Sequence, residues 1–105
     1  MYVSEAFDLG WFYGSARFIE TINEGFGGNI PDFVMEIIGG EKEVKQATKD
    51  VAKWHKGTHE IVEKEGLQNI ADDGECAGYD DLKEDVIAAY KAKKMKVPKF
   101  IQGRP

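Results

Sequence analysis

The chain contains 105 residues, of which 14 are basic and 19 acidic, and its formal net charge at pH 7 is −5. Its content of 42% hydrophobic and 31% charged residues excludes both a disordered chain and a membrane-embedded one. At this length we expect one domain with a modest hydrophobic core.

Residues 9–22 form the densest hydrophobic and aromatic run of the chain and predict a first helix over residues 4–24. On a helical wheel the apolar residues gather on two faces, with Phe7, Trp11, Phe18 and Ile22 on one and Leu9, Phe12, Ala16 and Ile19 on the other. A helix with two apolar sides must bury both of them against other helices, so we expect it at the centre of the fold. Any partner contact of this helix is expected along its remaining line, which holds Gly10, Tyr13, Arg17 and Glu20.

Small residues recur every four positions along this first helix, at Ala6, Gly10 and Gly14. Glycine inside a helix costs roughly 1 kcal/mol relative to alanine, so two of them need a structural reason. Small side chains allow a second backbone to come close. We therefore expect tight packing within the chain, with a homodimer or partner interface as the alternative.

Residues 25–29, with the sequence GFGGN, cannot hold a helix and predict a flexible connection. Phe26 in that connection either plugs the core or forms an exposed contact, and burial is the favoured interpretation. Pro31 suits the first turn of a second, short helix, which Gly39 and Gly40 end. The apolar residues of this helix repeat with helical spacing and need cover from the first helix; they are Ile30, Phe33, Val34, Ile37 and Ile38.

Residues 41–65 predict a long amphipathic helix. One side is apolar and includes Val44, Ala47, Val51, Trp54, Thr58, Ile61 and Val62. The opposite side carries a lysine stripe, which consists of Lys42, Lys45, Lys49, Lys53 and Lys56. Gly57 lies within the segment and indicates a kink or a break in the helix.

Residues 66–78 are rich in glycine and in acids and predict a loop. A final helix is expected to begin at Asp80 or Asp81, where the sequence DLKE resembles a capping box, and to bury apolar residues from Leu82 onward. Pro98 ends any helix. We therefore expect one helical domain over residues 1–97 and a flexible basic tail over residues 98–105.

Charge is segregated along the chain. Residues 91–105 hold six Lys or Arg and no acid, so the other 90 residues, with eight bases and nineteen acids, carry a net charge of −11. This pattern predicts an acidic body with a basic C-terminal arm. The lysine stripe and the lysines of the arm, Lys91, Lys93, Lys94, Lys96 and Lys99, can bind nucleic-acid phosphates and define an alternative function.

Metal-binding and catalytic patterns are weak in this sequence. His55, His59 and Glu63 are spaced by four residues and form a candidate metal clamp, but two boundary histidines on an amphipathic helix are the favoured interpretation. Residues 73–84 match an EF-hand loop at its sixth and twelfth positions and fail at Ala77 and Asp80. No nucleotide-binding or hydrolase motif is present, so we expect neither enzymatic activity nor a cofactor.

The single cysteine, Cys76, excludes an internal disulfide and a multi-cysteine zinc site, and it fits a reducing compartment. Carboxylates near it make it a poor nucleophile. The first residues lack a basic region and a signal-peptidase site. We therefore expect a cytoplasmic protein.

Together these patterns predict an all-α bundle of four or five helices around the helix of residues 4–24. We expect a small non-enzymatic regulatory or inhibitory protein, monomeric or homodimeric, that binds another macromolecule and most simply a protein. In size and charge it resembles the accessory proteins of phages and mobile elements, many of which inhibit host enzymes. The expected partner-binding residues are Gly10, Tyr13, Arg17, Glu20, Phe26, Asp72, Asp73, Glu75, Asp80 and Asp81. The alternatives are a nucleic-acid-binding module and an acidic mimic of nucleic acid.

Overall fold

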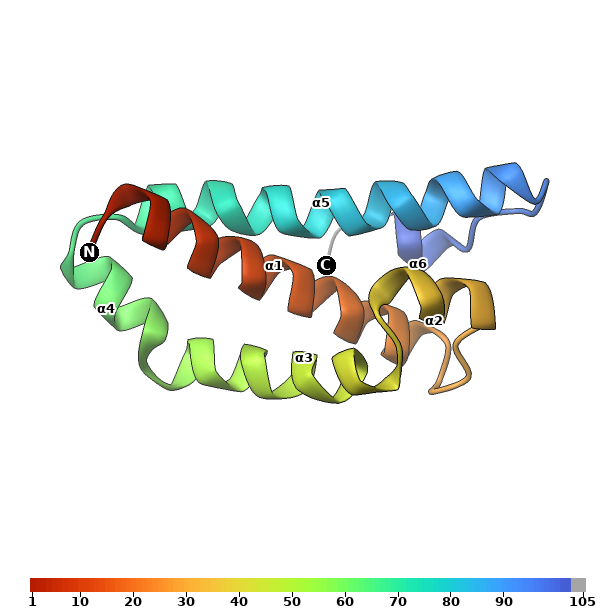
Figure 1. Cartoon of the computed structure of the whole chain (residues 1–105), viewed down its shortest axis with the longest axis horizontal. Coiled ribbons are helices and arrows are strands. Elements are labelled where there is room, and N and C mark those ends of the chain that lie inside the picture. Colours follow the sequence, from red (N-terminus) through yellow and green to blue (C-terminus); the bar gives the residue numbers. More distant parts are fainter. Residues whose placement is uncertain (103–105) are drawn as a thin grey trace.

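The computed structural model describes residues 1–102, which are almost entirely helical and contain no β-strand (Figure 1). The helices are α1 (Val3–Gly25), α2 (Asp32–Ile38), α3 (Glu41–Lys53), α4 (His59–Lys64), α5 (Gln68–Ala92) and α6 (Lys99–Gln102), and the π-helical turn η1 (Trp54–Thr58) joins α3 to α4. The molecule is elongated, with extents of 45 × 22 × 20 Å. The predicted all-α bundle is confirmed.

Helix α1 lies between α5 and α3, which pack against its opposite sides (Figure 1). Its C-terminal half supplies much of the main hydrophobic core, where Phe18 and Ile22 have no exposed surface. Residues of α2, α3, α5 and α6 complete this core; they include Val34, Ile38, Ala47, Tyr79, Val86, Tyr90 and Ile101. The predicted central position of the first helix is therefore confirmed.

Helix α5 begins at Gln68 and continues to Ala92. The prediction of a loop over residues 66–78, followed by a helix that starts at Asp80 or Asp81, is therefore wrong. Gly74 and Gly78 lie inside it and face α1, where an added Cβ would overlap the carbonyl oxygens of Phe7 and Trp11. The capping box and the EF-hand loop do not exist, since their residues lie within one continuous helix. Glycines that are poor for a helix in isolation are tolerated here because two backbones meet across them.

The small residues of α1 form the other half of this contact. A Cβ at Gly10 would overlap the backbone of Ala71, and a Cβ at Gly14 would overlap the backbone of Glu75. Both helices thus present glycines four residues apart to one another. The prediction that Gly10 and Gly14 serve tight packing within the chain is confirmed.

The segment predicted as one helix over residues 41–65 is interrupted by η1. Gly57 has φ 179° and ψ −25°, which departs from helical geometry, so the predicted kink at this glycine is confirmed. After η1 the chain turns toward the start of α5, and Val62 of α4 packs with Ala6 and Ala71 in a second, smaller core (Figure 1).

The predicted flexible tail is wrong for residues 99–102, which form α6. Ile101 has no exposed surface, and the Phe100 ring packs edge-on against Phe26 with 5.0 Å between ring centroids. Burying these two side chains is what orders the segment. Phe26 consequently packs against the main core, as predicted. Residues 103–105 of the predicted tail, with Arg104, lie outside the described residues.

Among residues 1–102, no helix has the length and hydropathy needed to cross a bilayer.

Candidate functional site

The N-terminal half of α1 exposes aromatic side chains that the sequence predicts to be buried. Phe12 is 61% exposed and Phe7 is 36% exposed, whereas Phe18 and Ile22 of the same helix are fully buried. Trp11 is half-buried, and its ring meets the Phe12 ring edge-on with 5.6 Å between centroids. We call Phe7, Trp11 and Phe12 the aromatic face.

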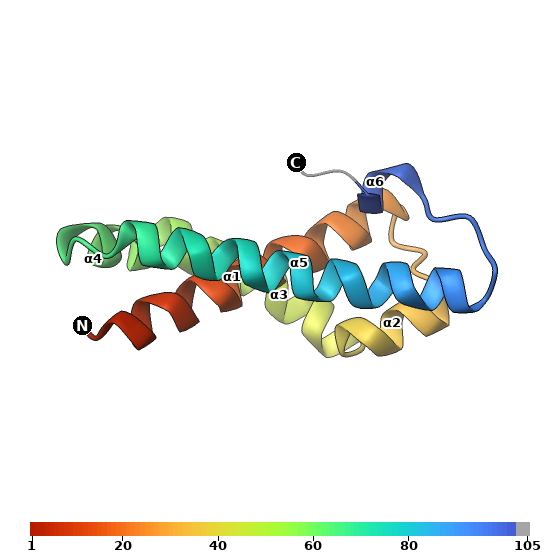
Figure 2. The same ribbon diagram turned by 90° about the horizontal axis from the view of Figure 1, so that it is seen from above.

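The prediction that neighbouring helices bury Phe7 and Phe12 is wrong, and the placement of those helices explains why. Helix α5 occupies the glycine side of α1, and α3 with η1 occupies the side that carries Tyr13. Figure 2 shows α1 crossing α5 at an angle, and near the N-terminus Ala6 of α1 packs with Val62 of α4 and Ala71 of α5. On the remaining side Phe7 and Phe12 are exposed, and Trp11 is half-buried beside Asp81 of α5.

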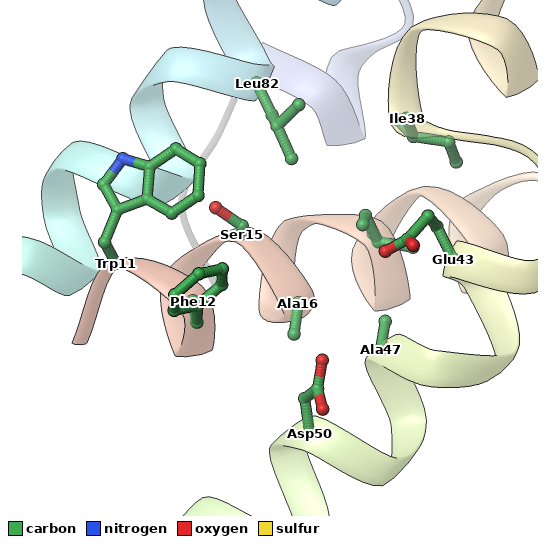
Figure 3. Close-up of a pocket in the computed structure, with 10 residues that line it drawn as sticks. Trp11, Phe12, Ser15, Ala16, Ile38, Glu43, Ala47, Asp50 and Leu82 are labelled. Atoms are coloured by element: carbon green, nitrogen blue, oxygen red, sulfur yellow. The ribbon is translucent and has the colours of Figure 1, made fainter. Parts of the chain in front are cut away.

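Two adjoining clefts lie beside the aromatic face and share Phe12 and Asp50 in their linings. The first, of about 180 Å³, has Ser15, Ala16 and Ile19 of α1 as its floor and lies between α2, α3 and α5. Figure 3 shows Trp11 and Phe12 at one end of this cleft and Ile38 at the other. The second cleft, of about 330 Å³, continues between α1 and η1 and is lined by Leu9 and Trp54 among others.

Carboxylates border these apolar clefts. The Glu43 and Asp50 side chains of α3 line the first cleft, and their oxygens point from α3 toward the lining residues of α1 (Figure 3). Neither has an ion-pair partner within residues 1–102, although Asp50 accepts a hydrogen bond from Gln46 Nε2 at 3.0 Å. On the α5 side, Asp81 accepts a 3.4 Å hydrogen bond from the indole nitrogen of Trp11. Lys53 lines the second cleft.

The line predicted as the partner contact of α1 is occupied within the chain. Gly10 and Tyr13 are buried, Gly10 against α5 and Tyr13 against η1, where its ring stacks on Trp54 at 4.7 Å between centroids. The Tyr13 hydroxyl lies 3.0 Å from His55 Nε2. Arg17 donates from Nη1 to Glu75 Oε1 at 2.7 Å and also lies over the Tyr13 ring. These side chains hold α1 against η1 and α5, and their role as partner contacts stays a prediction.

Burial and neighbouring charges shift the pKa values of Tyr13 and Arg17. Burial raises the pKa of Tyr13, and the carboxylates of Glu75 and Glu20 raise it further, while Arg17 opposes them. Burial alone lowers the pKa of Arg17, but its hydrogen bond to Glu75 and nearby negative charge outweigh burial, and the net shift is upward. At neutral pH a neutral phenol therefore lies beside the charged guanidinium of Arg17.

Glu20 is the fourth member of the predicted line and is half-buried on α1. Burial raises its pKa, and the neighbouring carboxylate of Glu24 raises it further. The charges of Arg17 and His55 act in the opposite direction without cancelling the rise.

The acidic residues predicted as partner contacts lie along α5. Asp72, Asp73 and Asp81 are exposed, Asp80 is half-buried, and Glu75 is paired with Arg17. Of this group, the structure brings Asp81 to the aromatic face through its hydrogen bond with Trp11.

The candidate metal clamp is not assembled. The rings of His55 and His59 are 6.5 Å apart between centroids, and each ring has another partner, the Tyr13 hydroxyl for His55 and the Trp54 carbonyl for His59. The π-turn changes the angular spacing, so residues four apart no longer stack as they would in an α-helix. In residues 1–102 no three His, Cys, Asp or Glu side chains are placed to hold a metal ion.

The lysines keep the exposure that the sequence predicts. All five lysines of the stripe are exposed on α3 and η1, and Lys91, Lys93, Lys94, Lys96 and Lys99 are exposed around the C-terminal end of α5 and in α6. The Lys93 ammonium lies 5.0 Å from the centroid of the Phe33 ring. The two groups of lysines thus lie on separate elements.

The sequence prediction missed Glu43 and Asp50 and assigned the aromatic face to the core. A usable signal was present, because glycines at positions 10 and 14 commit one side of α1 to a single close neighbour. The one other long apolar stripe, that of residues 41–65, cannot bury two further sides of α1.

Comparison with known proteins identifies no relative. No family model, no curated protein and no solved structure matches this chain.

Proposed function

We propose that this chain is a small non-enzymatic protein that acts by binding another protein through the aromatic face of α1. The observation that carries the proposal is Phe12, which is 61% exposed and stands where two apolar clefts meet. Exposed aromatic residues beside concave apolar surface are typical of protein interfaces, where Trp and Phe anchor the contact.

A regulatory or inhibitory role suits this geometry. The aromatic face belongs to a long helix that α3 and α5 hold on two sides, so the surface is presented in one fixed shape. Preorganised surfaces bind with a smaller loss of conformational entropy. A chain that occupies a partner's surface in this way acts by blocking or altering that partner.

Photo-crosslinking tests the proposal directly. A benzophenone amino acid replaces Phe12 in one variant and Ile61 in a matched control, since Ile61 is also exposed, at 54%, but lies on α4 away from the clefts. In cells of its source we expect a discrete protein adduct from position 12 and none from position 61. Equal adducts from both positions, or none from either, would contradict the proposal.

A second candidate function is nucleic-acid binding, favoured by the full exposure of the lysine stripe on one side of α3 and η1. Its test is an electrophoretic shift across a salt series, with Lys45→Gln and Lys49→Gln as the variants. Deleting the basic arm is unsuitable because the deletion also removes Ile101 from the core. Binding that falls steeply with salt and weakens in the variants supports this candidate, and no shift at low salt contradicts it.

A further inference from the structure

We infer that the groove over α1, between α3 and α5, receives a positively charged amphipathic helix of the partner protein. This inference rests on the proposed function and names the chemistry of the partner at the same site. The groove comprises the two clefts that meet at Phe12 and Asp50. Its length follows α3, whose 13 residues span about 20 Å, so it accommodates a helix of about four turns.

The groove has the shape that a helix needs. Helices α3 and α5 pack on opposite sides of α1, and the floor between them consists of small and apolar side chains such as Ala16 and Ile19. Leu82 of α5 and Ala47 of α3 stand on the two sides, and Phe12 stands at the junction of the clefts (Figure 3). An added helix would bury its apolar stripe on this floor and complete a four-helix arrangement.

The charge at the rim selects a basic helix. Glu43 and Asp50 line the groove on the α3 side without an ion-pair partner in the described residues, and Lys53 is the basic residue in the lining of its second cleft. Lysine or arginine residues beside an apolar stripe would reach these two carboxylates along the α3 edge. An acidic helix would be repelled there.

The same charges disfavour a second copy of this chain as the occupant. In a symmetric dimer each groove would face an identical groove, so Glu43 and Asp50 of both copies would approach one another. The body of the chain, residues 1–90, carries a net charge of −11, which adds to the repulsion.

Three synthetic 15-residue peptides test the inference by fluorescence anisotropy with purified protein. The first has leucines at helical spacing flanked by lysines, the second replaces the lysines by glutamates, and the third has the composition of the first in scrambled order. We expect the first peptide to bind at least tenfold more tightly than either of the others. Equal binding of the ordered and scrambled lysine peptides would show attraction by net charge alone and would overturn the inference.

Variants locate the binding on the protein. Phe12→Asp and the pair Glu43→Lys with Asp50→Lys are expected to weaken binding of the first peptide at least tenfold. The matched control is Asp72→Lys with Asp73→Lys, which changes net charge by the same amount at exposed positions of α5 and should weaken binding less than threefold. Circular dichroism confirms that each variant is folded. Equal weakening by the groove pair and the control pair overturns the inference.

Two further outcomes separate this inference from the proposed function. If position 12 captures a protein but none of the peptides binds, the proposed function stands and the basic-helix partner is wrong. If sedimentation shows a dimer that Phe12→Asp dissociates, a second copy fills the groove and the inference is overturned.

Discussion

The hydroxyl of Tyr79 is a polar group that is buried in the main core without a hydrogen-bond partner among the described residues. Tyr79 is 5% exposed, its ring meets Phe18 edge-on at 5.2 Å between centroids, and its hydroxyl has no hydrogen-bond partner within residues 1–102. A buried polar group without a partner costs about 1–3 kcal/mol. We expect Tyr79→Phe to raise the free energy of unfolding by about that amount in urea denaturation. Tyr2→Phe, at a residue 77% exposed, is the control and should change nothing. A loss of stability in Tyr79→Phe would show that the hydroxyl is bonded.

Glu20 makes stability depend on pH. Burial, followed by the charge of Glu24, raises its pKa above the value of 4.5 expected in the unfolded chain. The folded state therefore holds the proton more tightly, and this residue's contribution to stability is lost as pH rises from 4.5 through the folded pKa. We expect Glu20→Gln to melt at a higher temperature than the wild type at about pH 7, with no difference at about pH 3.5. Glu36→Gln, at an exposed residue, is the control, and a lower melting temperature for Glu20→Gln at neutral pH contradicts the account.

At the scale of helices, the contact between α1 and α5 depends on glycine. Replacing an exposed helical glycine by alanine stabilises a protein by roughly 1 kcal/mol, because alanine favours the helix. At Gly10 and Gly14 the added Cβ would overlap the backbone of α5, so we expect the opposite sign. Gly14→Ala should lower the free energy of unfolding by about 1–3 kcal/mol, measured by chemical denaturation.

The control for this prediction is Asp73→Ala, at an exposed position of α5 beside Gly74. It should leave stability nearly unchanged. A Gly14→Ala variant that is more stable than the wild type would show that the two backbones do not meet at this glycine.

Helix α6 is expected to contribute to stability in spite of its four residues. Ile101 is fully buried, and truncating a buried isoleucine to alanine costs about 2–5 kcal/mol. We expect a loss of this size for Ile101→Ala and almost none for Lys99→Ala, at an exposed residue of the same helix. Equal stability of the two variants in thermal and urea unfolding would show that the segment is not docked.

The elements show which parts of the fold can be predicted from sequence. Helices α1 and α2 and the kink at Gly57 were predictable because apolar periodicity and glycine placement are local signals. The first half of α5 was not, since glycines and acids at short range favour a loop. It is helical because Gly74 and Gly78 meet the backbone of α1, more than sixty residues earlier in the chain. The spacing of four residues, shared with Gly10 and Gly14, is the signal that predicts this pairing.

At the scale of the whole molecule, the candidate site was the least predictable part. Periodicity identifies which side of a helix is apolar, but it does not show which sides its neighbours cover. Phe12 and Phe18 have the same hydrophobic character, and only the placement of α3 and α5 leaves the first exposed and buries the second. In the same way, Tyr13 and Arg17 were assigned to a partner because the sequence does not show that Trp54 and Glu75 lie against them.

The central claim is that the groove beside Phe12 is the binding surface of this protein. Titration of the isotope-labelled protein with the leucine-lysine peptide, followed by the amide resonances in nuclear magnetic resonance spectra, tests it most directly. We predict that the largest shifts fall at residues lining the two clefts, such as Phe12, Ser15 and Asp50, while residues on the outer side of α3, such as Lys45, change little. Shifts spread evenly over the surface, or concentrated on the lysine stripe, would contradict the account.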